Sequence, residues 1–171
     1  RNEKVGNVSA ARNAGSAISR GHYLLYLDAD DMLLRTALDD LLEVAINCKN
    51  DTAVVYPDWI CYPEGKPHMA ENWSLDRLMD HALFAITFLH PKEAWETVGG
   101  FDEEIEWWED WDYTIRLALA GYKGIRRPKP LFIYRYDTGF RREESLNRRH
   151  EVMKQIRGKY AAATPKRRTG G

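Results

Sequence analysis

An apolar run at residues 22–27 is followed at once by three carboxylates, Asp28, Asp30 and Asp31. A run of this length is typical of a buried strand and is too short for a typical helix. Carboxylates beside a buried strand are costly unless their charge is compensated, and a divalent cation with phosphate oxygens on its far side compensates it. A second acidic cluster lies at residues 109–112. Together the two clusters indicate a metal-dependent enzyme that acts on a nucleotide-activated substrate.

The rest of the chain alternates between strand-like and helix-like patterns. Apolar residues at helical spacing predict helices near 9–20, 38–46, 74–81, 92–98, 111–120 and 146–160, and short apolar runs predict strands at 22–27, 53–56, 84–89 and 131–136. Pro57 is expected to stop the second strand, and residues 60–72 read as a loop or an irregular hairpin. This alternation predicts an α/β domain with a mostly parallel sheet flanked by helices.

The charge of the chain excludes a nucleic-acid-binding protein by bulk electrostatics, because the net charge is −1 over 171 residues. The charge is uneven, however, since residues 141–168 hold ten Lys or Arg against three Glu. This segment reads either as a solvated helix or as a helix that touches phosphates or an anionic membrane surface. We expect residues 163–171 to be a disordered basic tail.

The compartment is inferred from what the sequence lacks. Cys48 and Cys61 form no disulfide or metal-binding pattern, which fits a reducing compartment. No apolar run approaches the ~20 residues that span a bilayer. We therefore expect a cytoplasmic protein, with peripheral contact at the cytoplasmic face of a membrane through the basic final helix as one option. The chain starts without Met, and we expect it to be a piece of a longer protein.

Taken alone, Asp28-x-Asp30 is a weak motif. The three carboxylates fit turn and capping residues, and Asp31 is placed to cap the following helix. Phosphatases with an aspartyl nucleophile also carry Asp-x-Asp after a strand, but those usually have Thr or Val soon after the second Asp, where this chain has Asp31 and Met32. A hard cation such as Mg²⁺ or Mn²⁺ is the third option, because it prefers oxygen ligands.

Longer blocks of sequence favour the third option. They are Val-Ser-Ala-Ala-Arg-Asn-Ala-Gly at 8–15, Gly-His-Tyr-Leu-Leu-Tyr-Leu-Asp-Ala-Asp-Asp at 21–31, Val-Gly-Gly-Phe-Asp-Glu at 98–103 and Trp-Glu-Asp-Trp-Asp-Tyr-Thr-Ile-Arg-Leu-Ala at 108–118. Over about residues 5–136 the chain resembles the family 2 glycosyltransferases of the GT-A fold. The resemblance implies inverting transfer of a sugar from a nucleotide-diphosphate sugar to a hydroxyl of a carbohydrate or lipid-linked acceptor. Polysaccharide, lipopolysaccharide or glycan synthesis are the processes it implies.

The resemblance also implies roles on the donor side. Asp30 would bind Mg²⁺ or Mn²⁺ directly, and Asp28 would lie near the donor ribose or a metal-bound water. Arg12 and Asn13 would lie near the donor nucleotide. Many family members carry a metal-binding His after the last strand, and Asp137 stands at about that position here.

On the acceptor side, Asp110 matches the general base of the family and Glu109 would shape the acceptor site. A carboxylate must accept the proton of the attacking hydroxyl, and we expect the dipole of the helix that Asp110 starts to favour its ionised form. Trp107 and Trp108 precede this helix and are candidates to stack on a sugar ring. Trp111 fits the apolar stripe of the helix and is predicted to lie in the core.

The chain departs from the family at its start. Family members begin with a strand-helix-strand unit that holds the nucleoside, and the sequence lacks this unit. We therefore interpret residues 1–162 as a partial GT-A domain, truncated at the N-terminus, that carries the metal and acceptor half. The alternative is a non-catalytic carbohydrate- or partner-binding remnant of such a domain.

Overall fold

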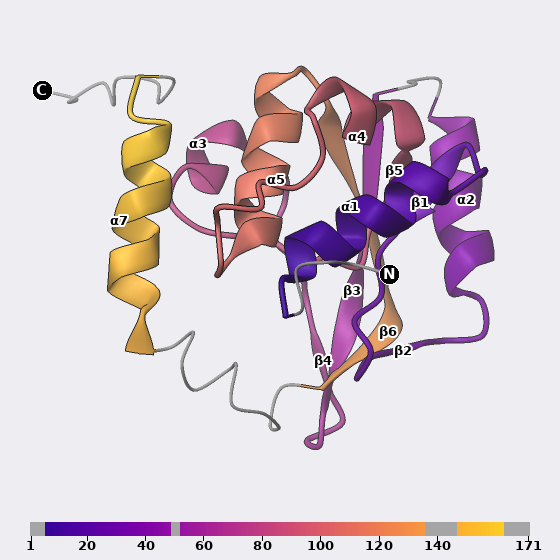
Figure 1. Ribbon diagram of the computed structural model, residues 1–171. Coiled ribbons are helices and arrows are strands. Elements are labelled where there is room, and N and C mark those ends of the chain that lie inside the picture. The colour runs from indigo at the N-terminus through magenta and orange to yellow at the C-terminus, as the bar shows by residue number, and fades with distance from the viewer. Residues whose placement is uncertain (1–5, 49–51, 136–146, 163–171) are drawn as a thin grey trace, which may run out of the picture.

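The computed structural model describes residues 6–48, 52–135 and 147–162. Its helices are α1 Val8–Ile18, α2 Ala37–Asn47, α3 Leu75–Leu78, α4 Lys92–Thr97, α5 Glu109–Leu119 and α7 Arg149–Lys159, and its strands are β1 Tyr23–Leu25, β2 Met32–Leu33, β3 Ala53–Tyr62, β4 Lys66–His68, β5 Leu89–Pro91 and β6 Lys123–Arg135. The helices flank a sheet, with α1 crossing in front of the strands (Figure 1). The predicted α/β class is confirmed.

The sheet has the order β1-β5-β3-β6-β2, and β4 pairs with β3. Only the long pairing of β3 with β6 is parallel among the described strands, whereas β1–β5, β3–β5, β2–β6 and β3–β4 are antiparallel. The expectation of a mostly parallel sheet is therefore wrong in this detail. Antiparallel strands can follow one another without a crossover connection, as β3 and β4 do around the turn at residues 63–65.

Strand β3 runs through Pro57, where the sequence predicted its end. The register between β3 and β6 shifts on both sides of Asp58, which is a bulge of the kind that admits Pro within a sheet. Asp58 is buried and accepts two hydrogen bonds from Arg126 at 2.8 Å and one from Ala70 N at 2.9 Å. This contact fixes the bulge, so β3 continues into the hairpin with β4.

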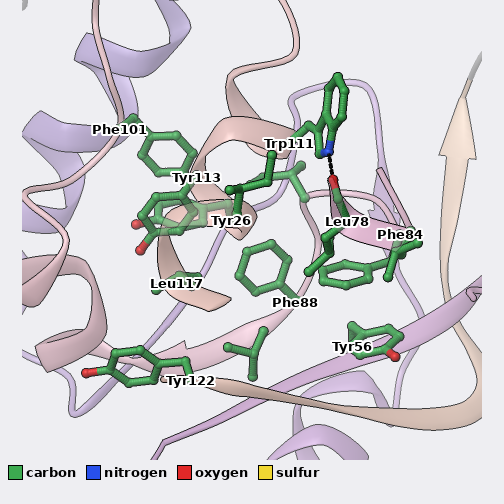
Figure 2. Close-up of a cluster of buried hydrophobic side chains, with 14 of the residues drawn as sticks. Tyr26, Tyr56, Leu78, Phe84, Phe88, Phe101, Trp111, Tyr113, Leu117 and Tyr122 are labelled. Atoms are coloured by element: carbon green, nitrogen blue, oxygen red, sulfur yellow. Dashed lines mark hydrogen bonds between the residues drawn. The ribbon is translucent and has the colours of Figure 1, made fainter. Parts of the chain in front are cut away.

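The two faces of the sheet carry two apolar cores, because neighbouring residues of β3 point to opposite sides. Val55 packs with Leu41 of α2 on one face. Tyr56 packs on the other face with Phe84 and with Trp111 of α5, and the indole of Trp111 donates a 2.6 Å hydrogen bond to Leu78 O (Figure 2). Each such buried side chain contributes roughly 1.5–3 kcal/mol. The predicted core position of Trp111 is confirmed.

One local prediction is wrong. Residues 84–88 form no strand, and Phe84, Ile86 and Phe88 are buried in the core without ladder pairing. In α7, His150 is exposed, and Val152, Ile156 and Tyr160 form the buried face. Within the described ranges, no helix is long and apolar enough to cross a bilayer.

His90 of β5 is fully buried between Tyr26, Phe88 and Tyr113. Its Nδ1 lies 2.8 Å from Pro91 O, and its Nε2 lies 3.4 Å from the Tyr113 hydroxyl. Burial lowers the pKa of His90 from 6.5 to about 4. Protonation therefore favours the unfolded chain, so the stability that neutral His90 permits is present above pH 6.5 and is lost as the pH falls toward 4.

We predict that His90→Phe removes this pH dependence. The free energy of unfolding of the natural chain should fall by about 2 kcal/mol relative to the variant between pH 7.5 and pH 5. Urea titrations at the two pH values measure the difference. The exposed His22 provides the matched control: in His22→Phe the free energy of unfolding should change with pH as it does in the natural chain. An equal change between pH 7.5 and pH 5 in the natural chain and in His90→Phe would contradict the prediction.

Candidate functional site

A cavity of about 680 Å³ opens beyond the carboxyl end of β1. One group of its lining residues is charged and comes from α1, the loop after β1, the start of α5 and the end of β6: Arg12, Asp28, Asp30, Glu109, Asp110 and Arg135. A second group is aromatic: Trp59, His68, Phe84, Trp107, Trp108 and Tyr134. The cavity thus brings together the two acidic clusters of the sequence.

Arg12 joins these two clusters. Its Nη2 donates to Asp28 Oδ1 and its Nη1 donates to Glu109 Oε1, both at 2.7 Å. The side chains of Arg12 and Glu109 are 10% exposed and that of Asp28 is 38% exposed. The guanidinium also lies 5.3 Å from the centre of the Phe101 ring. Arg12 therefore fixes the loop after β1 relative to the start of α5.

Asn13, the neighbour of Arg12, lies outside the lining of the cavity. Its Oδ1 accepts hydrogen bonds from Phe101 N at 2.7 Å and from the Trp95 indole at 3.1 Å. Its Nδ2 donates to Phe101 O at 2.9 Å and to Glu103 Oε1 at 3.1 Å. The side chain thus holds the segment before α5, and donor binding by Asn13 stays a prediction.

The three carboxylates after β1 have different surroundings. Asp30 is exposed and Asp28 is half-exposed, and both line the cavity. Asp31 is buried and accepts a 2.9 Å hydrogen bond from Arg135 N of β6. Helix α2 instead starts after Thr36, so the prediction that Asp31 caps it is wrong: five residues, including β2, lie between them.

The carboxylate oxygens at the cavity suit a hard cation that keeps water and phosphate ligands. Mg²⁺ is usually held by one or two carboxylates together with substrate phosphates, and Asp28 and Asp30 supply such carboxylates at the cavity. No group of three or more His, Cys, Asp or Glu placed to hold a metal occurs among the residues that the structure describes. Asp137, the other predicted ligand, lies outside the described residues.

Asp110 lies in the first turn of α5, and its Oδ1 accepts a 2.8 Å hydrogen bond from Trp111 N. Burial, together with the nearby charge of Glu109, raises the pKa of Asp110 to about 7. Burial and the charge of Glu109 thus act against the ionised form that the position at the start of α5 was expected to favour. A carboxyl group with this pKa can both accept and release a proton near neutral pH.

Two tryptophans precede Asp110, and both line the cavity. Trp107 is 8% exposed. Trp108 has φ 61° and ψ 33°, in the left-handed region that a bulky residue adopts rarely. Such backbone conformations persist where the surrounding structure enforces them and cluster at functional sites. The acceptor role predicted for Trp107 and Trp108 stays a prediction that their position favours.

Several lining residues escaped the sequence interpretation. Trp59 and His68 pair across the β3–β4 hairpin, and their rings stack at 4.3 Å. Glu71 and Arg135 also line the cavity. The sequence left residues 60–72 open between a loop and an irregular hairpin, and the structure shows the hairpin, with Pro63 and Gly65 in its turn. Trp59 and His68 were missed because Pro57 was expected to end the strand before Trp59.

Comparisons with known proteins agree with this geometry. Residues 1–127 match glycosyl transferase family 2. The chain is 30% identical over 118 residues to the uncharacterised protein y4gI of Sinorhizobium fredii, covering 67% of this chain and 13% of that protein. It is 25% identical over 124 residues to a chondroitin synthase and to a hyaluronan synthase of Pasteurella multocida, covering 68% of this chain and 12% of each. The chain therefore spans about an eighth of the length of these relatives.

Among solved structures, the fold is similar to residues 1–349 of S. aureus TarS, with a TM-score of 0.64 and 19% identity. The match covers 88% of this chain and 44% of that one, and the same values hold for TarS in complex with UDP. This likeness shows the predicted GT-A fold. With the match over residues 1–127, it leads to one conclusion: the chain belongs to glycosyl transferase family 2.

Proposed function

We propose that this chain is the metal- and acceptor-binding half of an inverting glycosyltransferase. It would transfer a sugar from a nucleotide-diphosphate sugar to a hydroxyl of a carbohydrate or lipid-linked acceptor, in the synthesis of a polysaccharide, lipopolysaccharide or glycan. The observation that carries the proposal is the contact of Arg12 with both Asp28 and Glu109 in one cavity. The names of the two Pasteurella multocida synthases and the UDP complex of TarS support the substrate classes.

On the donor side, Asp30 would hold Mg²⁺ or Mn²⁺, and Asp28 would contact a metal-bound water or the donor ribose. When bound, the cation neutralises the charge that develops on the leaving diphosphate. Arg12 is engaged by two carboxylates, so its contribution on the donor side is to orient Asp28. Asp137 remains a proposed further ligand outside the described residues.

On the acceptor side, Asp110 would act as the general base. Its Oδ1 accepts the amide hydrogen of Trp111, which leaves Oδ2 to take the proton of the acceptor hydroxyl. The hydroxyl oxygen then forms a bond to the anomeric carbon while the bond from that carbon to the diphosphate breaks. Glu109 is held by Arg12 and would orient the acceptor, with Trp107 and Trp108 as candidate surfaces for its sugar ring.

We predict that Asp110→Asn in the natural full-length protein abolishes transfer while donor binding persists. The amide keeps the size and the hydrogen bond to Trp111 N but cannot accept the proton, so turnover should fall by about 10²–10⁴-fold. Radiolabelled sugar transfer measures turnover, and calorimetry with the donor measures binding.

The matched control is Asp39→Asn, at an exposed aspartate of α2, which should transfer at the natural rate. Retained turnover in Asp110→Asn would remove Asp110 as the base. A non-catalytic remnant would show no transfer in any variant.

We predict that Asp30→Ala removes metal dependence together with activity. Loss of a carboxylate that holds the cation should lower transfer by at least about 100-fold. Transfer is measured over a series of Mn²⁺ concentrations, and bound Mn²⁺ is counted by electron paramagnetic resonance. Asp39→Ala serves as the control for a lost surface charge. An unchanged Mn²⁺ response in Asp30→Ala would rule out the metal assignment.

A further inference from the structure

Asp112 connects α5 to the C-terminal helix α7. Its side chain is 0% exposed, and its Oδ2 accepts a 2.8 Å hydrogen bond from Arg116 Nε. Its Oδ1 accepts hydrogen bonds from Lys159 Nζ at 2.7 Å and from the Tyr160 hydroxyl at 2.6 Å. A buried carboxylate is tolerated when donors satisfy it in this way. Asp112 is therefore a structural junction that does not line the cavity.

The helix α7 also holds the segment that leads into α5. Lys159 Nζ lies 2.7 Å from Asp102 Oδ2, and Arg148 Nη1 lies 3.7 Å from Glu106 Oε2. Figure 1 shows α7 standing at the left, next to α3 and α5. Lys159 and Arg148 belong to the charge excess at residues 141–168, and these contacts pair both of them within the chain. Membrane contact through α7 stays a prediction.

From Asp112 the contacts continue to α1. Arg116 Nη1 donates to Val98 O at 2.8 Å and to Gly100 O at 2.5 Å. Gly100 has φ +74°, and a Cβ there would lie 2.5 Å from Asn13 Oδ1, so this turn packs directly on the residue after Arg12. Asp112 in the first turn of α5 is thus linked to Lys159 and Tyr160 on one side and, through Arg116, to the turn at 98–101 on the other.

We propose that Asp112 is a positioning residue for Asp110 and that α7 is the brace through which it acts. This inference rests on the proposed function, in which Asp110 is the general base. Asp110 and Asp112 lie in the same first turn of α5, so a shift of one moves the other. A general base must lie within about 2.6–3.2 Å of the proton it takes, and a displacement of about 1 Å costs on the order of 10²-fold in rate.

The test uses Lys159→Met and Tyr160→Phe in the full-length protein. Each removes one donor to Asp112 and keeps the size of the side chain. We expect kcat to fall about 10-fold or more while the KM for the nucleotide-sugar donor stays within about twofold, because the base moves and the donor side does not. Lys159→Arg should restore most of kcat. Lys154→Met, at an exposed lysine of the same helix, should match the natural protein.

Amide hydrogen exchange gives a readout that needs no activity. In Lys159→Met and Tyr160→Phe, exchange at residues 102–112 should rise, while exchange in β3 and β6 stays as in the natural protein. Tyr160→Phe removes a single hydroxyl group, so it keeps the test valid where Lys159→Met fails to fold.

If kcat of both variants equals that of the natural protein, or if KM rises by as much as kcat falls, the proposal that α7 positions Asp110 through Asp112 is wrong. A full-length protein that transfers no sugar from any donor would instead overturn the proposed function. In that case the exchange measurement alone tests whether α7 holds residues 102–112. Unchanged exchange at these residues would refute it.

Discussion

The double ion pair of Arg12 is the interaction on which the site depends. A guanidinium that is 10% exposed holds Asp28 from the loop after β1 and Glu109 from the start of α5, both at 2.7 Å. The Arg12–Glu109 pair is buried on both sides, and removing one partner of such a pair costs about 3–5 kcal/mol because the remaining charge is left uncompensated. The two acidic clusters therefore keep a fixed relative position, which any reaction between a metal-bound donor and an acceptor held near Asp110 requires.

The surroundings of this ion pair set the chemistry of Asp110. Burial and the charge of Glu109 raise its pKa to about 7, whereas the charge of Arg12 opposes the rise. Arg12 thus neutralises Glu109 and limits the repulsion that Asp110 feels. Asn13 and Gly100 secure the segment before α5 against α1, and Asp112 secures α5 against α7. The start of α5 and the segment before it are thus held from α1 and from the region of α7.

The sequence predicted which residues line the cavity better than it predicted the strand geometry. Asp28 and Asp30 were singled out because carboxylates beside a buried strand are costly, Glu109 and Asp110 through the resemblance to family 2 glycosyltransferases, and all four line the cavity. The strand directions, the continuation of β3 through Pro57 and the environment of Asp31 were missed. The spacing of apolar residues and the positions of Pro describe local structure only. The bulge at Asp58 depends on a contact with Arg126, which lies 68 residues away in the sequence. The raised pKa of Asp110 likewise depends on burial, which the local dipole argument omits.

The most direct test of the central claim is the anomeric configuration of the product. If Asp110 is the single base of a direct displacement, the acceptor oxygen attacks the face opposite the leaving diphosphate. The full-length protein supplied with an α-linked nucleotide-sugar should then yield a β-linked product, as read from the coupling constant of the anomeric proton by nuclear magnetic resonance. An α-linked product would contradict the account.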